Sequence, residues 1–223
     1  MKFQLFCQAV VKFAVGAAAV GLVLFGCAGT VHYPRGWLLM GILFVPMFAA
    51  GLVMLVKCPA LLEKRLHARE QRSAQSLVIR LSGLLFIAAF AAAGFSYRFG
   101  FWQTPGWVSG AAAAVFVLAY LLYAEVLREN TWLSRTISVQ EGQTLVDTGL
   151  YGIVRHPMYS VTVFLFLSMP LVLGSWLAFW ILLGYPAVLV GRIRDEEAFL
   201  TDQLPGYPAY QKKVRWRLIP GIW

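Results

Sequence analysis

The segment Asp147-Thr-Gly-Leu-Tyr-Gly-Ile-Val-Arg-His-Pro-Met-Tyr159 combines charged, aromatic and glycine residues in a chain that is otherwise mostly apolar. It leads directly into 35 residues, Pro157 to Gly191, that contain no Asp, Glu, Lys or Arg. Charge returns immediately afterwards in Arg192-Ile-Arg-Asp-Glu-Glu-Ala198. Because polar groups at a membrane boundary are costly unless they are solvated or paired, this order predicts a functional site where a membrane hairpin meets water.

The uncharged run is too long for one membrane span and too short for two full ones. A straight helix of its 35 residues would reach about 52 Å, whereas the hydrocarbon core is about 30 Å thick. Pro170 and Gly174-Ser175 interrupt the run and favour a break there. We therefore expect a short helical hairpin, formed by Pro157–Leu171 and Trp176–Gly191, with both ends on the same side of the membrane.

The composition indicates an all-α, polytopic membrane protein. The chain has 223 residues, of which 60% are hydrophobic and 13% charged, and its mean hydropathy is +0.70. A soluble domain is about half apolar and about a quarter charged. With the hairpin we expect about six transmembrane segments, the first of them an uncleaved helix rather than a signal peptide. The four expected segments before the hairpin cover residues 10–28, 37–56, 81–97 and 107–124.

This arrangement of segments predicts that the chain has two regions and a defined orientation in the membrane. Residues 1–128 would hold the four N-terminal segments, and residues 129–223 would hold the hairpin and a cofactor site. In the six-segment arrangement, 17 of the 19 basic residues lie on one side, and only Arg35 and Arg98 lie on the other. The excess of positive charge predicts that both termini and the site are cytoplasmic, in a plasma membrane or a bacterial inner membrane.

The charge and cysteine content narrow the expected partners. The net charge of +9 is explained by topology and by anionic lipid headgroups, so no nucleic-acid partner is expected. The three cysteines are scattered without metal-ligand spacing, and we expect no metal site. Membrane lipids are the expected surroundings, and the sequence does not disclose an oligomeric state.

The polar segment also carries a resemblance to a known family. Arg155-His-Pro-Met-Tyr159 is followed downstream by the acidic pair Glu196-Glu197. Two tyrosines, Tyr207 and Tyr210, come next. The combined pattern resembles the isoprenylcysteine carboxyl methyltransferase family, and the related phospholipid N-methyltransferases share it.

The resemblance covers residues 130–223 and has one departure. The family usually carries glycine two positions after the motif tyrosine, where this chain has Val161. The resemblance implies an S-adenosylmethionine-dependent methyltransferase that acts on a lipophilic acceptor. The expected acceptor is the carboxyl group of an isoprenylcysteine-like or prenylated compound, or another small lipid.

The residue types near the motif suit such a cofactor. Carboxylates and aromatic faces suit a sulfonium or ammonium group, and arginine suits a carboxylate. By resemblance, the expected cofactor-binding residues are Tyr151, His156, Pro157, Met158, Tyr159, Glu196, Glu197, Tyr207 and Tyr210. The expected catalytic residues are Arg155, Arg194 and Glu197. Sequence alone does not separate the roles of the two adjacent glutamates.

Two other functions stay open at this point. The closing Leu218-Ile-Pro-Gly-Ile-Trp223 and the Arg-His-x-x-Tyr spacing are also similar to membrane sterol and steroid reductases, which use NADPH. Those enzymes tend to place Asn before the motif tyrosine, where this chain has Met158. A non-enzymatic membrane scaffold is the third hypothesis. A transport pathway is disfavoured because the expected spans contain almost no ionisable residues.

Overall fold

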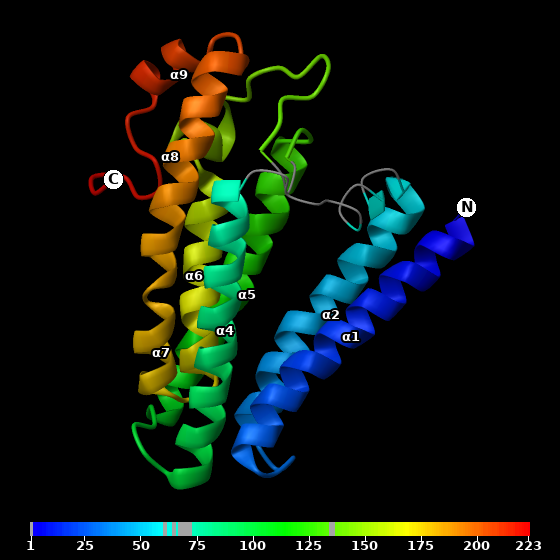
Figure 1. Ribbon diagram of the computed structural model, residues 1–223, viewed down its shortest axis with the longest axis vertical. Coiled ribbons are helices and arrows are strands. Elements are labelled where there is room, and N and C mark those ends of the chain that lie inside the picture. The colour runs from blue at the N-terminus through cyan, green and yellow to red at the C-terminus, as the bar shows by residue number, and fades with distance from the viewer. Residues whose placement is uncertain (1, 60–61, 64–65, 67–72, 134–136) are drawn as a thin grey trace.

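The computed structural model describes residues 2–59, 62–63, 66, 73–133 and 137–223, and every regular element within them is helical (Figure 1). The elements in chain order are α1 (Lys2–Ala28), α2 (Pro34–Lys57), α4 (Ser73–Phe99), α5 (Gly106–Glu129), the 3-10 turn η1 (Gly149–Gly152), α6 (Pro157–Val172), α7 (Trp176–Leu182), α8 (Tyr185–Gln203) and α9 (Tyr207–Lys213). The all-α prediction is confirmed.

Five stretches are long and apolar enough to cross a membrane. They are Gln4–Ala28, Pro34–Lys57, Gln75–Phe99, Gly106–Glu129 and Trp176–Gln203, the last formed by α7 and α8 together. The shorter apolar helix Pro157–Val172 is the first arm of the expected hairpin. Because about 20 apolar residues are needed to span the hydrocarbon, the five longer stretches confirm the prediction of a polytopic membrane protein.

The predicted hairpin is present, but its second arm differs from the expectation. The break falls at Gly174, whose φ of +84° favours glycine, and at Ser175, whose hydroxyl accepts a hydrogen bond from the backbone N–H of Ala178 at 3.1 Å. The expected second arm, Trp176–Gly191, is not one continuous helix. A turn separates α7 from α8, and α8 continues to Gln203 because its charged residues remain helical beyond the apolar stretch.

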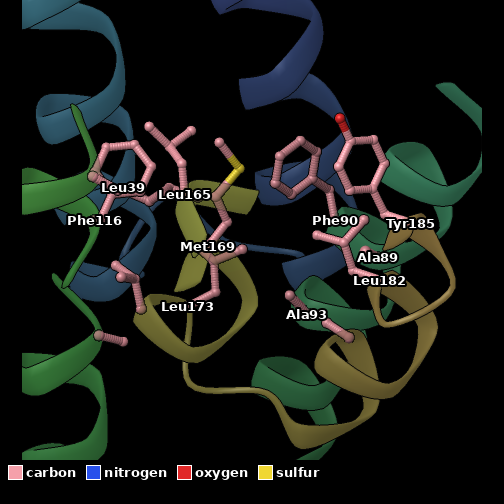
Figure 2. Close-up of a cluster of buried hydrophobic side chains, with 14 of the residues drawn as sticks. Leu39, Ala89, Phe90, Ala93, Phe116, Leu165, Met169, Leu173, Leu182 and Tyr185 are labelled. Atoms are coloured by element: carbon pink, nitrogen blue, oxygen red, sulfur yellow. The ribbon is translucent and has the colours of Figure 1, made fainter. Parts of the chain in front are cut away.

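Helix α6 lies inside the bundle and supplies much of its core. Figure 2 shows Leu165, Met169 and Leu173 from this region among buried side chains of the surrounding helices. The neighbouring side chains labelled there are Leu39 of α2, Ala89, Phe90 and Ala93 of α4, Phe116 of α5, Leu182 of α7 and Tyr185 of α8. The expected boundary at residue 128 coincides with the end of α5, and helices on both sides of it share this core.

Helices α1 and α2 contact the rest of the bundle mainly near the loop that joins them. There, the Tyr33 hydroxyl donates to the Leu173 carbonyl, and Arg35 Nη1 donates to the Thr104 carbonyl at 3.1 Å. From this end the two helices diverge from the other helices (Figure 1). At the opposite end of the bundle, α5 and α8 end and the loop after α5, η1 and α9 gather. The polar residues of the expected site lie at this end of the bundle.

Candidate functional site

The motif residues are positioned by the first turn of α6 and by the C-terminal tail. Pro157 opens α6, where its missing N–H costs nothing, and His156 before it is non-helical with φ −125° and ψ 61°. The backbone N–H groups of Arg155 and His156 donate to the carbonyls of Trp216 and Arg217, both at 2.9 Å. The tail therefore pairs with the segment that leads into the helix.

Glu197 is the centre of a buried ionic cluster that ties these parts together. Its Oε1 accepts from Arg155 Nε at 2.7 Å and lies 3.2 Å from His156 Nε2, and its Oε2 accepts from Arg217 Nε at 2.8 Å. Arg155 Nη1 also donates to the carbonyls of Val214 and Arg215, at 2.7 and 2.9 Å. The Glu197 carboxylate is thus occupied by protein groups, as a buried charge requires.

Glu196 has different surroundings, because successive residues of an α-helix point about 100° apart. Its Oε2 accepts a hydrogen bond from the Tyr159 hydroxyl at 2.6 Å. That hydroxyl in turn accepts from Arg192 Nε at 2.7 Å. Within the described part of the chain, no hydrogen bond reaches the other oxygen of Glu196, which lines a pocket. The two glutamates that sequence left unseparated therefore have separate environments.

The pocket lies at the polar end of the bundle and contains about 830 Å³ of space between its walls, including the open mouth. Eight residues expected from the sequence line it, namely Tyr151, Arg155, His156, Met158, Tyr159, Glu196, Tyr207 and Tyr210. The structure brings most of the expected set together, although its members come from η1, α6, α8 and α9.

One wall of the pocket was not expected from the sequence. It is formed by the loop after α5, with mostly apolar or neutral side chains. The lining residues from this loop are Asn130, Trp132, Leu133, Ile137, Ser138, Gln143, Thr144, Leu145 and Val146. The loop has no helical periodicity and no charged motif, which is why the sequence did not indicate this wall. Arg192, Leu200 and Leu204 complete the lining from α8 and its end.

Two buried tyrosine hydroxyls in the lining have no hydrogen-bond partner of acceptable geometry among the described residues, those of Tyr151 and Tyr207. Burial raises the pKa of both phenols above the ordinary value, so both hydroxyls stay protonated at neutral pH. A buried polar group without a partner is unusual and costly. The two hydroxyls are therefore candidates for contact with a ligand.

Tyr151 is held in the wall by η1. The Glu129 carboxylate at the end of α5 accepts from the Thr148 hydroxyl at 3.0 Å and from the backbone N–H of Leu150 at 3.1 Å. Gly149 has φ +49°, and a Cβ there would lie 2.0 Å from Glu129 Oε1. On the other side, the Tyr210 hydroxyl donates to the Tyr151 carbonyl at 2.7 Å.

Four residues singled out in the sequence do not line the pocket. Arg194 is exposed on α8, and Glu197 is buried in its ionic cluster. Pro157 is buried at the start of α6, where it is the first residue of the helix. Val161, which replaces the family's glycine, is buried in the core one turn further on. The roles expected for Arg194 and Glu197 in catalysis therefore have no direct support from pocket geometry.

The chemistry of the pocket suits an organic ligand with positive charge. An unpaired carboxylate oxygen lies beside tyrosine rings, and the opposite wall is largely apolar. Among the residues that the structure describes, no group of three or more His, Cys, Asp or Glu side chains is placed to bind a metal ion.

Comparison with known proteins is consistent with this site. Residues 106–205 match the phospholipid methyltransferase family. Over almost its whole length, the chain has the fold of the eukaryotic intramembrane Ras methyltransferase, isoprenylcysteine carboxyl methyltransferase. The TM-score is 0.58 at 21% identity, with 92% of this chain and 75% of that structure covered. The resemblance identified from the motif is confirmed.

Curated relatives match over shorter regions. The Δ14-sterol reductase TM7SF2 of Mus musculus is 34% identical over 91 residues, and the Δ14-sterol reductase of Methylotuvimicrobium alcaliphilum is 29% identical over 93 residues. Each match covers 40% of this chain and only 22% of the relative. The cobalt-zinc-cadmium resistance protein CzcN of Cupriavidus metallidurans is 27% identical over 145 residues, which is 53% of this chain and 62% of that protein.

Proposed function

We propose that this protein, which resembles the isoprenylcysteine carboxyl methyltransferases, is an integral-membrane methyltransferase that uses S-adenosylmethionine and methylates a lipophilic acceptor. The acceptor would be the carboxyl group of an isoprenylcysteine-like compound or another small lipid. The observation that carries the proposal is the pocket itself. It presents one unpaired carboxylate oxygen of Glu196 among aromatic side chains, at the boundary between the apolar helices and the polar end of the bundle.

The residues present fit the donor molecule. The free oxygen of Glu196 suits a sulfonium or ammonium group. The unpaired hydroxyls of Tyr151 and Tyr207 suit polar atoms of the adenosine. The apolar side chains of the loop after α5 suit the adenine ring.

For methyl transfer, the main task of the protein is to position the donor and the acceptor. The bound donor supplies an electrophilic methyl carbon, to which an acceptor lone pair forms a bond while the electrons of the C–S bond return to sulfur. Glu196 would orient the positive end of the donor, and Tyr159 fixes Glu196 by its hydrogen bond. The Glu197 cluster would hold the start of α6 and the tail in place behind the pocket.

The location of the pocket suits an acceptor that is delivered from the bilayer. Its wall includes the first turn of α6, an apolar helix within the bundle, and the part of α8 where charge begins. A water-soluble donor would enter from the aqueous side and the lipid from the membrane side. The proposed orientation, with both termini and the pocket in the cytoplasm, follows from the distribution of basic residues.

The proposal is tested by transfer of a radiolabelled methyl group. Purified protein in detergent is incubated with labelled S-adenosylmethionine and a total lipid extract, and label is counted in the organic phase. We expect transfer by the wild-type protein and by Glu141→Gln, which changes an exposed carboxylate of the loop, and loss of transfer in Glu196→Gln. Equal transfer by Glu196→Gln and wild type would contradict the proposed role of Glu196.

The second candidate is an NADPH-dependent membrane reductase, favoured by the two Δ14-sterol reductases among the relatives. A 2′-phosphate is bound by cationic groups. Both guanidinium groups in the lining are already hydrogen-bonded to protein atoms, Arg155 to Glu197 and Arg192 to Tyr159. This arrangement supports the methyltransferase over the reductase.

A further inference from the structure

Gln75, at the start of α4, is a buried amide with only 1% of its surface exposed. Both ends of the amide contact charged groups of α8. Its Nε2 donates to Asp195 Oδ2 at 2.6 Å, and its Oε1 accepts from Arg192 Nη1 at 2.8 Å. An amide suits this place because it must donate to a carboxylate and accept from a guanidinium at the same time.

From Gln75, a continuous series of hydrogen bonds leads to the pocket. Arg192 Nε donates to the Tyr159 hydroxyl at 2.7 Å, and the Tyr159 hydroxyl donates to Glu196 Oε2 at 2.6 Å. The Arg192 guanidinium also lies 5.8 Å from the centre of the Tyr159 ring. The series joins α4, α8 and α6, and it ends at the carboxylate of Glu196, a residue that lines the pocket.

The hydrogen bond between Gln75 and Arg192 affects which charged groups can reach Glu196. Arg192 and Glu196 are four residues apart on α8, a spacing at which opposite charges pair directly. In the structure Arg192 instead bonds to Gln75 and Tyr159, so Tyr159 stands between the guanidinium and the carboxylate. The geometry around Arg192 includes hydrogen bonds to Gln75 and Tyr159, and Tyr185 is a further titratable group close to it. Without the amide of Gln75, a direct ion pair between Arg192 and Glu196 would compete with a cationic ligand.

We propose that Gln75 is a positioning residue of the pocket. It holds Arg192 away from Glu196 and thereby keeps one oxygen of Glu196 available to the positive charge of the bound cofactor. The helices before the motif region thus contribute a determinant of cofactor affinity, although their sequences carry no recognisable motif. This inference rests on the proposed function, because it concerns the affinity of the same pocket.

The test is calorimetric titration of detergent-purified protein with S-adenosylhomocysteine, which keeps the ammonium group of the donor. Gln75→Leu removes both hydrogen bonds, and Gln75→Glu removes the donation and places a negative charge against Asp195. We expect both to weaken binding about tenfold. Gln75→Leu leaves Arg192 without its acceptor, and in Gln75→Glu the repulsion from Asp195 displaces the new carboxylate from its place beside Arg192. Leu77→Ala, on an exposed position of the same helix, should bind as the wild type does.

A double variant separates positioning from general damage to the fold. Gln75→Glu combined with Asp195→Asn exchanges the donor and acceptor between these two positions and restores both hydrogen bonds. We expect its affinity to return to within about threefold of wild type, as coupled neighbours do in a double-mutant cycle. The melting temperature of each variant is measured in parallel.

The possible results lead to distinct conclusions. Wild-type affinity in Gln75→Leu and Gln75→Glu, or no recovery in the double variant, would overturn the role of Gln75 while leaving the proposed function intact. If Gln75→Leu fails to fold, Gln75→Glu and the double variant decide the question. If the wild-type protein itself binds no S-adenosylhomocysteine, the proposed function fails, and the role of Gln75 fails with it.

Discussion

Glu196 and Glu197 are adjacent in the chain, but the structure separates their environments. Glu197 bonds to Arg155 and Arg217 and is 5% exposed, whereas Glu196 bonds to Tyr159 and faces the pocket. The helical phase of α8 causes this division. We therefore expect the same chemical change at the two positions to give different phenotypes.

Glu196→Gln should weaken binding of S-adenosylhomocysteine at least about tenfold, because a neutral amide replaces a charged acceptor. The melting temperature should change little, since only the Tyr159 bond is altered on the protein side. Calorimetry and thermal unfolding in detergent measure the two quantities. Unchanged affinity in this variant would remove Glu196 from the cofactor site.

The main effect of Glu197→Gln should be a lower stability of the folded protein. It leaves the buried guanidinium of Arg155 without its carboxylate, and removal of one partner from a buried ion pair costs about 3 kcal/mol. We expect a melting temperature several degrees below that of wild type, measured by unfolding in detergent. A variant with wild-type stability would show that the ionic cluster does not hold the tail and α6 together.

The two tyrosines of α9 offer a matched comparison. Tyr207→Phe removes a buried hydroxyl that has no partner among the described residues, so stability should be unchanged or slightly higher, while affinity for S-adenosylhomocysteine should fall. Tyr210→Phe removes the bond to the Tyr151 carbonyl and should lower stability by about 1 kcal/mol. Unfolding and titration of both variants provide the measurement. Unaltered affinity in Tyr207→Phe would contradict a ligand role for its hydroxyl.

At the residue scale, the sequence predicted which side chains meet but not how they are arranged. The motif residues His156, Met158 and Tyr159 line the pocket as expected because they are close in the chain and share the start of one helix. The separation of the glutamates depends on the exact phase of α8. The contact between Gln75 and Arg192 joins residues far apart in sequence, and no local pattern indicates it.

At the scale of elements, the packing of α1 on α4 depends on Gly94. A Cβ at this position would lie 2.6 Å from the Leu24 carbonyl oxygen and 2.9 Å from the Ala28 backbone nitrogen. Backbone atoms cannot move aside as a flexible side chain can. Small residues that allow such close approach are typical of helix contacts in membranes.

We expect Gly94→Ala to lower the free energy of unfolding by about 2 kcal/mol, because the two helices must separate to admit the methyl group. Gly83→Ala on the same helix is the control, since nothing lies within 4 Å of a Cβ there, and its stability should be unchanged or slightly raised. Thermal unfolding in one detergent compares the two variants. Equal stability of the two would contradict the observed contact between α1 and α4.

The hairpin illustrates what local sequence can predict about an element. The break at Gly174-Ser175 was predicted correctly because glycine and the helix-capping serine have local causes. The apolar part of the second arm ends at Gly191, and α8 continues past it to Gln203. The end of the apolar run marks where the environment changes, and the backbone hydrogen bonds of the helix continue past it.

At the scale of the whole molecule, the arrangement of the helices supports a prediction of topology. The loop between α1 and α2 lies at one end of the bundle, and the loop that lines the pocket lies at the other (Figure 1). The positive-inside rule predicts that the pocket loop faces the cytoplasm. Val31 and Glu141 are exposed positions in these two loops.

Single cysteines at these positions test the orientation after Cys7, Cys27 and Cys58, which form no disulfide, are replaced by alanine. We expect a membrane-impermeant maleimide to label Glu141→Cys only from the cytoplasmic side and Val31→Cys only from the other side. Vesicles of the two orientations provide the measurement. Labelling of both positions from the same side would contradict the six-segment topology.

The central claim is that the pocket around Glu196 binds the products and substrates of methyl transfer. The most direct test is calorimetric titration of the detergent-purified wild-type protein with S-adenosylhomocysteine and, separately, with NADPH. The proposed function predicts binding of S-adenosylhomocysteine in the micromolar range, about −8 kcal/mol, and no binding of NADPH. Binding of NADPH without binding of S-adenosylhomocysteine would contradict it and identify the protein as a reductase.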